Sequence, residues 1–111
     1  MGLTKAEITK FNNIKKCIKK LPPERREAAA KLASKAEFME SEINKLQEII
    51  AEKGWKESYQ NGANQSGYKR SVEGETYIAL IKNFNSTIRL LYDMMPSDSD
   101  SQDELETWLQ R

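Results

Sequence analysis

An uninterrupted heptad pattern constrains this chain more than any other feature. Between Pro23 and Gly54 no helix breaker occurs, and the apolar residues recur at alternating spacings of three and four. Such a pattern is typical of a helix that buries one narrow seam against a partner helix. At 1.5 Å of rise per residue, a helix of this length is a rod of roughly 45 Å. The seam residues are Ala29, Leu32, Ala36, Met39, Ile43, Leu46 and Ile50.

A second seam runs from about Glu75 to Met95, and Pro96 ends it. Ile78, Leu80 and Leu90 widen its apolar face, so this helix should contact more than one neighbour. Two such helices joined by a polar insert predict an antiparallel helical hairpin. The pattern leaves open whether the seams pair within one chain, between copies, or both. The seam residues are Tyr77, Ile81, Phe84, Ile88, Leu91 and Met95.

The N-terminal segment predicts a third helix, over residues 4–20. Thr4 and Glu7 have the spacing of a capping box, in which each residue satisfies a backbone donor of the other. Apolar residues at helical spacing form one stripe, and lysines occupy the rest of the surface. The helix should end before Pro22, because proline disfavours a helical conformation in the preceding residue.

The insert at 54–74 holds four of the chain's five glycines. Its segments WKESYQ and YKRSV both alternate, which predicts a small β-hairpin at the tip of the helical hairpin. A register in which paired residue numbers sum to 127 brings together favourable cross-strand pairs. The alternative is a mobile loop. The three expected pairs are Trp55 with Val72, Glu57 with Arg70, and Tyr59 with Tyr68.

Charge is unevenly distributed along the 111 residues. Residues 1–36 contain ten lysines and arginines against three acids, a net charge of +7, whereas residues 97–111 contain one against five, a net charge of −4. A basic head and an acidic tail suggest two different partners. The alternative is that both charge types only solvate helices. Only 38% of the residues are hydrophobic, which is low for a monomer of this size and favours a core completed by other copies.

The residue types exclude most kinds of catalysis. The chain has no histidine and a single cysteine, Cys17, so we expect no zinc site, no His-based triad and no internal disulfide. Phosphate-binding glycine motifs are absent. We therefore expect a non-catalytic protein with no cofactor, no metal and no small-molecule substrate. No run of eighteen apolar residues is present, and MGLTKAEITK lacks the apolar core of a signal peptide, so no membrane is expected.

The order of these parts resembles a known family. The segments that carry the resemblance are KLASKAEFMESEINKLQEIIAEKGW, then NGANQSGYKRSVEGE, then IKNFNSTIRLLYDMMPSDS. In layout the chain resembles the small terminase subunit of tailed bacteriophages, the short type with a helix–turn–helix-like head and a helical-hairpin oligomerisation core. The resemblance implies a DNA-recognition subunit that forms rings in the cytoplasm of the host bacterium. Such a subunit binds viral DNA and delivers it to the large terminase subunit.

On this reading the chain is mainly α and has three parts. Residues 1–36 are a basic DNA-binding head, residues 37–96 are the oligomerisation core, and residues 97–111 are an acidic linker with a short docking helix. Phosphate contacts of the head would supply affinity, and amide side chains could read base edges. The alternative for the lysines is a solvated face. The candidate DNA contacts are Lys10, Asn12, Asn13, Lys15, Lys16, Lys19, Lys20, Arg25, Arg26, Lys31 and Lys35.

The core and the tail supply two further sets of candidates. The amphipathic tail segment of Leu105, Trp108 and Leu109 could dock on the large subunit, or fold back on its own chain or on a neighbouring copy. A different function fits the same pattern, namely a coiled-coil adaptor or a phage-encoded inhibitor of a host protein that binds no nucleic acid. The candidate oligomerisation residues are Leu32, Met39, Ile43, Leu46, Ile50, Trp55, Tyr59, Tyr68, Tyr77, Ile81, Phe84, Ile88 and Leu91.

Overall fold

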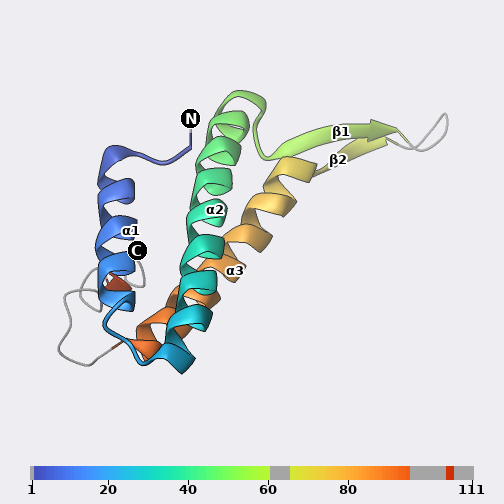
Figure 1. The fold of residues 1–111 in the computed structure, drawn as a ribbon. Helices are drawn as coiled ribbons and strands as arrows, with labels where there is room; N and C mark the ends of the chain where they lie inside the picture. Colours follow the sequence, from blue (N-terminus) through green and yellow to red (C-terminus); the bar gives the residue numbers. More distant parts are fainter. Residues whose placement is uncertain (1, 61–65, 96–104, 107–111) are drawn as a thin grey trace.

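The computed structural model describes residues 2–60, 66–95 and 105–106. In chain order these residues form α1 (Lys5–Ile18), α2 (Pro23–Lys53), β1 (Lys56–Gln60), β2 (Ser66–Arg70) and α3 (Val72–Met94) (Figure 1). The molecule is elongated, with extents of 63 × 26 × 21 Å. The prediction of a mainly α fold is confirmed.

The helix ends follow from local sequence signals. The capping box of α1 is present, because the Thr4 N–H donates to Glu7 Oε1 at 2.9 Å and the Glu7 N–H donates to Thr4 Oγ1 at 3.2 Å. Proline suits the first turn of α2, where a missing N–H costs nothing. After Lys53 the chain leaves the helix at Gly54, whose φ of +84° lies in the region that favours glycine.

The long helix α2 packs against α3 in a hairpin-like pair. Phe84, Ile88 and Leu91 of α3 are completely buried, and Ile43 of α2 is nearly so. Burying each of these large side chains stabilises the fold by about 1.5–3 kcal/mol. The two heptad seams therefore find much of their partner surface inside a single chain.

Helix α1 covers the other side of α2 (Figure 1). Its Phe11 and Ile14 are fully buried, as are Ala29 and Ala36 of α2. The small alanine side chains allow the two helices to approach closely. Because α2 packs on two helices rather than one, its buried face is wider than the predicted seam and also includes Ala33 and Glu40.

The two strands pair antiparallel, but not in the predicted register. Lys56 lies opposite Arg70 and Ser58 lies opposite Tyr68, so paired residue numbers sum to 126 rather than 127. The three expected cross-strand pairs are therefore wrong, since a slip of one residue moves each side chain to the opposite face. Trp55 lies outside the strand, and its carbonyl accepts a hydrogen bond from the Ser71 N–H at 2.8 Å. The expected turn runs from Asn61 through Gly67, but Ser66 and Gly67 belong to β2; residues 61–65 lie outside the described residues.

Helix α3 begins at Val72, three residues before the predicted start. Ser71 is its N-cap, with Oγ accepting from the Gly74 N–H at 3.0 Å. Glu73 and Glu75 lie in the first turn, where the helix dipole favours acids. The capping serine followed by acids was the signal for this start. The expected C-terminal helix falls almost entirely outside the described residues, of which only Leu105 and Glu106 belong to that segment.

Candidate nucleic-acid interface

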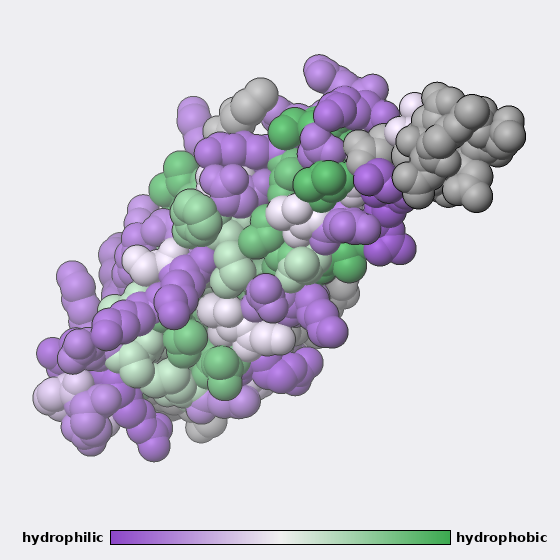
Figure 2. All heavy atoms as spheres, turned by 90° about the vertical axis from the view of Figure 1, so that its right-hand side faces the viewer, coloured by the Kyte–Doolittle hydropathy of each residue, from purple (hydrophilic) through white to green (hydrophobic). Residues whose placement is uncertain are grey.

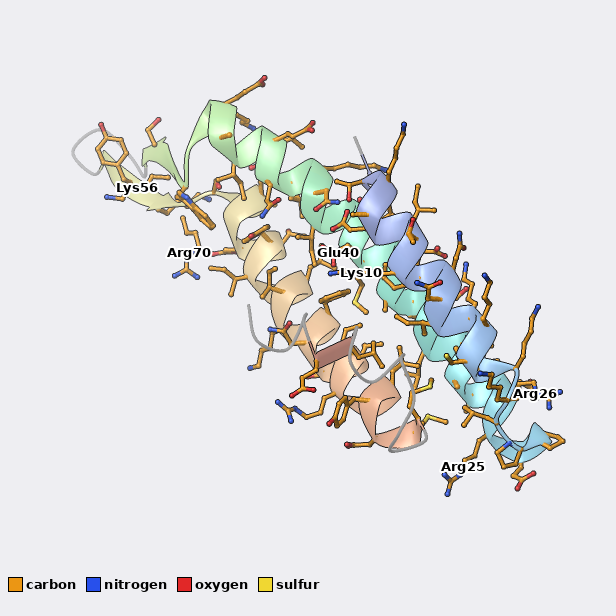
Figure 3. All side chains as sticks on the ribbon, turned by 90° about the vertical axis from the view of Figure 1, so that its left-hand side faces the viewer. Lys10, Arg25, Arg26, Glu40, Lys56 and Arg70 are labelled. Carbon is orange, nitrogen blue, oxygen red and sulfur yellow. The ribbon has the colours of Figure 1, made fainter. Side chains whose placement is uncertain are left out.

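The outer side of α1 carries the most continuous positive charge near the N-terminus. Phe11, Ile14 and Ile18 point into the core, which turns Lys16 and Lys19 to the solvent. Figure 3 shows side-chain nitrogens projecting along this outer side. The apolar stripe that anchors α1 thereby fixes which lysines are presented.

Ion pairs neutralise two of the candidate cations. Lys15 Nζ lies 3.1 Å from Glu37 Oε1 of α2, and Lys31 Nζ lies 3.7 Å from Glu27 Oε1 one helical turn earlier. Lys10 is half-buried and points toward the buried Glu40 in Figure 3. These three side chains are therefore less suited to phosphates than the sequence indicated.

Lys16, Lys19 and Lys20 remain fully available. All three are exposed, and they form no ion pair with the residues that the structure describes. Arg26 lies on the same side of the rod, and its guanidinium donates to the Leu21 carbonyl at 3.1 Å. A carbonyl does not cancel its charge. We call Lys16, Lys19, Lys20 and Arg26 the basic face.

The remaining candidate cations lie elsewhere. Figure 3 shows Arg25 directed to the opposite side of the rod end from Arg26. Lys35 is two positions before Glu37, the residue that contacts α1, and is therefore turned by about 200° around α2 from that contact. It lines a shallow surface hollow beside Phe38 instead. The candidate DNA contacts thus divide over at least two surfaces.

The two asparagines of α1 do not share one surface. Consecutive helical residues are about 100° apart, and only residues three or four apart are neighbours. Asn12 is exposed and is four residues before Lys16, so it belongs beside the basic face. Asn13 is half-buried and already takes part in a polar interaction. Asn12 is therefore the amide placed to accompany phosphate contacts.

Helices α1 and α2 run antiparallel along their length. Lys15 in the last turn of α1 contacts Glu37 of α2, and Asn44 Nδ2 of α2 donates to Glu7 Oε1 at 2.9 Å near the start of α1. In a helix–turn–helix motif the two helices instead cross at about 90–120°. Both contacts also cross the expected boundary at residue 36, which lies inside the continuous helix α2.

A polar joint fastens the start of α1 to α2. Asn44 donates to both the Gly2 carbonyl and Glu7, and Glu40 beside it is only 1% exposed. Burial raises the pKa of the Glu7 carboxyl, but hydrogen bonds from Thr4, Asn44 and Glu40 outweigh burial, so this pKa lies below its usual value. Burial of Glu40 was not predicted, although its spacing continues that of the buried Ala29, Ala33 and Ala36.

Most of the candidate oligomerisation residues are buried or partly buried within their own chain. Ile43, Ile50, Phe84, Ile88 and Leu91 are buried, and the seam residues between them are partly buried. A contact with another copy would need different side chains or the partly covered edges of the seam. The partly buried residues are Leu32, Met39, Leu46, Tyr77 and Ile81.

Other large apolar side chains remain exposed on the helices. Phe38 of α2 is 65% exposed and Leu90 of α3 is 53% exposed, with Ile49 and Ile78 also at the surface. Figure 2 shows apolar patches between charged side chains on the face turned away from α1. Trp55 and Tyr68 are exposed near the strands, whereas the Tyr59 side chain lies outside the described residues.

Of the three candidate docking residues of the tail, the structure describes only Leu105. This side chain is completely buried and belongs to the same core cluster as Phe11 and Phe84. Leu105 is thus occupied by its own chain in this structure. Trp108 and Leu109 lie outside the described residues.

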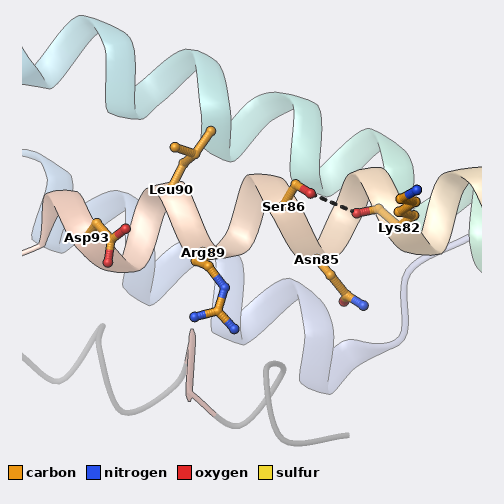
Figure 4. Close-up of a pocket in the computed structure, with 6 residues that line it drawn as sticks. All are labelled: Lys82, Asn85, Ser86, Arg89, Leu90 and Asp93. Carbon is orange, nitrogen blue, oxygen red and sulfur yellow. Dashed lines mark hydrogen bonds between the residues drawn. The ribbon is translucent and has the colours of Figure 1, made fainter.

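The hollow in Figure 4, about 530 Å³, is lined by Lys82, Asn85, Arg89 and their neighbours on α3 alone, and Ser86 there donates only to the Lys82 carbonyl of its own helix. A single helix cannot present converging groups to a substrate. Within residues 2–60, 66–95 and 105–106, no cluster of metal-ligating side chains occurs and no helix is long and apolar enough to cross a membrane.

No protein family, curated protein or solved structure matches this chain.

Proposed function

We propose that this chain is a non-catalytic, oligomeric DNA-binding protein, the small terminase subunit of a tailed bacteriophage. The observation that supports DNA binding is the basic face, in which four cations lie together without a carboxylate partner among the described residues. Cations whose charge is already offset by a neighbouring carboxylate attract phosphates less, whereas these four can release counterions from DNA on contact.

The proposed role follows the layout of the chain. The basic face would bind viral duplex DNA, and the exposed apolar side chains Phe38, Ile49, Ile78 and Leu90 would join copies into a ring. The ring would then recruit the large terminase subunit, which holds the ATPase and nuclease. The fold in this role is a helical hairpin with a two-stranded insert and a short C-terminal helix.

The test of DNA binding is equilibrium titration of a 30-base-pair duplex at several salt concentrations. Each phosphate contact contributes about 0.9 to the slope of log K against log salt, and about eightfold to affinity at 0.1 M salt. Replacing Lys16, Lys19 and Lys20 by glutamine should therefore lower affinity roughly 500-fold at 0.1 M salt. The matched control is Lys82→Gln with Arg89→Gln on the outer side of α3, which should change affinity little.

Light scattering tests the assembly. We expect a species well above a dimer, and Phe38→Asp with Leu90→Asp should convert it to smaller species without unfolding the helices. A monomeric wild-type protein would contradict the ring. A protein that assembles but binds no DNA at low salt would instead favour the alternative function, a coiled-coil adaptor or an inhibitor of a host protein.

A further inference from the structure

The two strands form a ribbon that projects beyond the helical body (Figure 1). Their sequences, KESYQ and SGYKR, hold three cations against one acid. The cations are Lys56 at the start of β1 and Lys69 and Arg70 at the end of β2. The ribbon therefore presents positive charge at the opposite end of the rod from Arg25 and Arg26 (Figure 3).

The observed register places two cations directly opposite each other. Lys56 pairs with Arg70 across the ribbon, so their Cβ atoms are about 4.5–5.5 Å apart. Like charges in this position destabilise a two-stranded sheet. Both side chains are exposed, and neither forms an ion pair with the described residues. An anion bound between them would remove the repulsion.

An exposed aromatic ring lies on the same face. Tyr68 is two residues from Arg70 on β2, and alternate residues of a strand point to the same side. Its side chain is 76% exposed, and its cross-strand partner is the small Ser58. Paired cations bind phosphates and a neighbouring aromatic ring packs on sugars or bases, which is the combination that nucleic-acid surfaces use.

The base of the ribbon is held firmly by the helices. The ring of Trp55 packs edge-on against Tyr77 with centroids 5.6 Å apart, and Lys53 Nζ lies 2.8 Å from Glu73 Oε1. These contacts, with the hydrogen bond from Ser71 to Trp55, fix the direction in which the strands leave the body. A preorganised ribbon loses less conformational entropy when it binds.

We propose that the Lys56, Arg70 and Tyr68 face of the ribbon is a second DNA contact, separate from the basic face. This inference rests on the proposed function. A two-stranded ribbon has the width to enter the major groove of duplex DNA. The two contacts lie toward opposite ends of a body 63 Å long, so one protomer binds a DNA segment at two places. The same face could instead join two copies, and the experiment separates these outcomes.

The first arm measures the affinity of a double variant, Lys56→Gln and Arg70→Gln, for the same duplex and compares it with that of wild type. Removal of two phosphate contacts should reduce the salt slope by about 1.8 and the affinity roughly 60-fold at 0.1 M salt. The control is again Lys82→Gln with Arg89→Gln, which removes one lysine and one arginine from an exposed helix face. Circular dichroism and light scattering should show unchanged folding and assembly for both variants.

Each outcome has a distinct meaning. If wild type binds no DNA, the proposed function and this inference both fail. If the basic-face variant loses affinity but the ribbon variant matches wild type, only the second contact is refuted. A ribbon variant that assembles differently would identify the ribbon as a subunit contact and overturn the inference.

The second arm identifies the partner directly and does not depend on the charge variants folding. A benzophenone amino acid replaces Tyr68 in the otherwise unchanged chain, and the protein is irradiated with the duplex present. We expect a protein–DNA adduct. An adduct between two protein copies, with none to DNA, would refute the proposal.

Discussion

Replacement of Glu7 tests the polar joint that fastens α1 to α2. The Glu7 carboxylate accepts from the Thr4 N–H and from the Asn44 amide, each at 2.9 Å. Two substitutions separate these roles. Glu7→Gln keeps an oxygen for the capping box, which accepts either residue at this position, but loses the charge. Glu7→Ala removes both the capping-box oxygen and the charge.

The magnitude follows from the bonds that are lost. Half a capping box is worth about 1 kcal/mol, and a hydrogen bond to a charged group contributes about 1.5–3 kcal/mol. Glu7 is only partly buried, so the lower part of that range applies. We expect Glu7→Ala to reduce the free energy of unfolding by about 2–3 kcal/mol and Glu7→Gln by about 1–2 kcal/mol.

The assay is urea unfolding followed by circular dichroism, at fixed protein concentration and at several pH values. Because the pKa of Glu7 is lowered from its usual 4.5 in the folded state, its stabilisation is complete above that pH. It is lost as the pH falls through the folded pKa. The gap between wild type and Glu7→Gln should therefore narrow as the pH falls below 4.5 and close once it has passed the folded pKa. A gap of the same size at low pH, or equal costs for both substitutions at pH 7, would refute this account.

Two further predictions test the ribbon base and the tail. In a Trp108→Phe background, Gly74→Ala should change the Trp55 fluorescence, because the added Cβ would lie 3.2 Å from Trp55 Cε3. The substitution should also fail to raise the free energy of unfolding by the ~1 kcal/mol that glycine-to-alanine changes can give in helices. A higher melting temperature with unchanged emission would contradict the close contact. Leu105→Ala should reduce the free energy of unfolding by about 2–4 kcal/mol, measured by urea titration, since this side chain is fully buried; a cost near zero would show that the tail does not dock on its own core.

The helical elements could be predicted because their signals are local. The Thr4–Glu7 box, the proline pair and Gly54 define where α1 and α2 begin and end. The apolar spacing of α3 likewise indicated its buried face, including Phe84 and Ile88. Each of these signals acts within one or two helical turns, so its effect does not depend on contacts with distant parts of the chain.

The partners of individual side chains could not be predicted in this way. The strand register depends on how the ribbon joins α2 and α3, and the observed register includes the like-charged pair of Lys56 and Arg70, which cross-strand pairing preferences disfavour. Glu40 appeared polar, yet packing of α2 between two helices buries it. The ion pair between Lys15 and Glu37 depends on the antiparallel arrangement of α1 and α2, which brings together residues 22 positions apart. No local pattern encodes such distant contacts.

The order in which the elements pack has a consequence for how the protein acquires its structure. Helix α1 packs on α2, α2 packs on α3, and β1 pairs with β2, so the principal contacts join elements close together in the chain. Contacts between neighbouring elements favour fast folding, because few long loops must close before they form. The α1–α2 pair can therefore form before α3 is free to pack, and among the described residues the burial of Leu105 comes last in chain order.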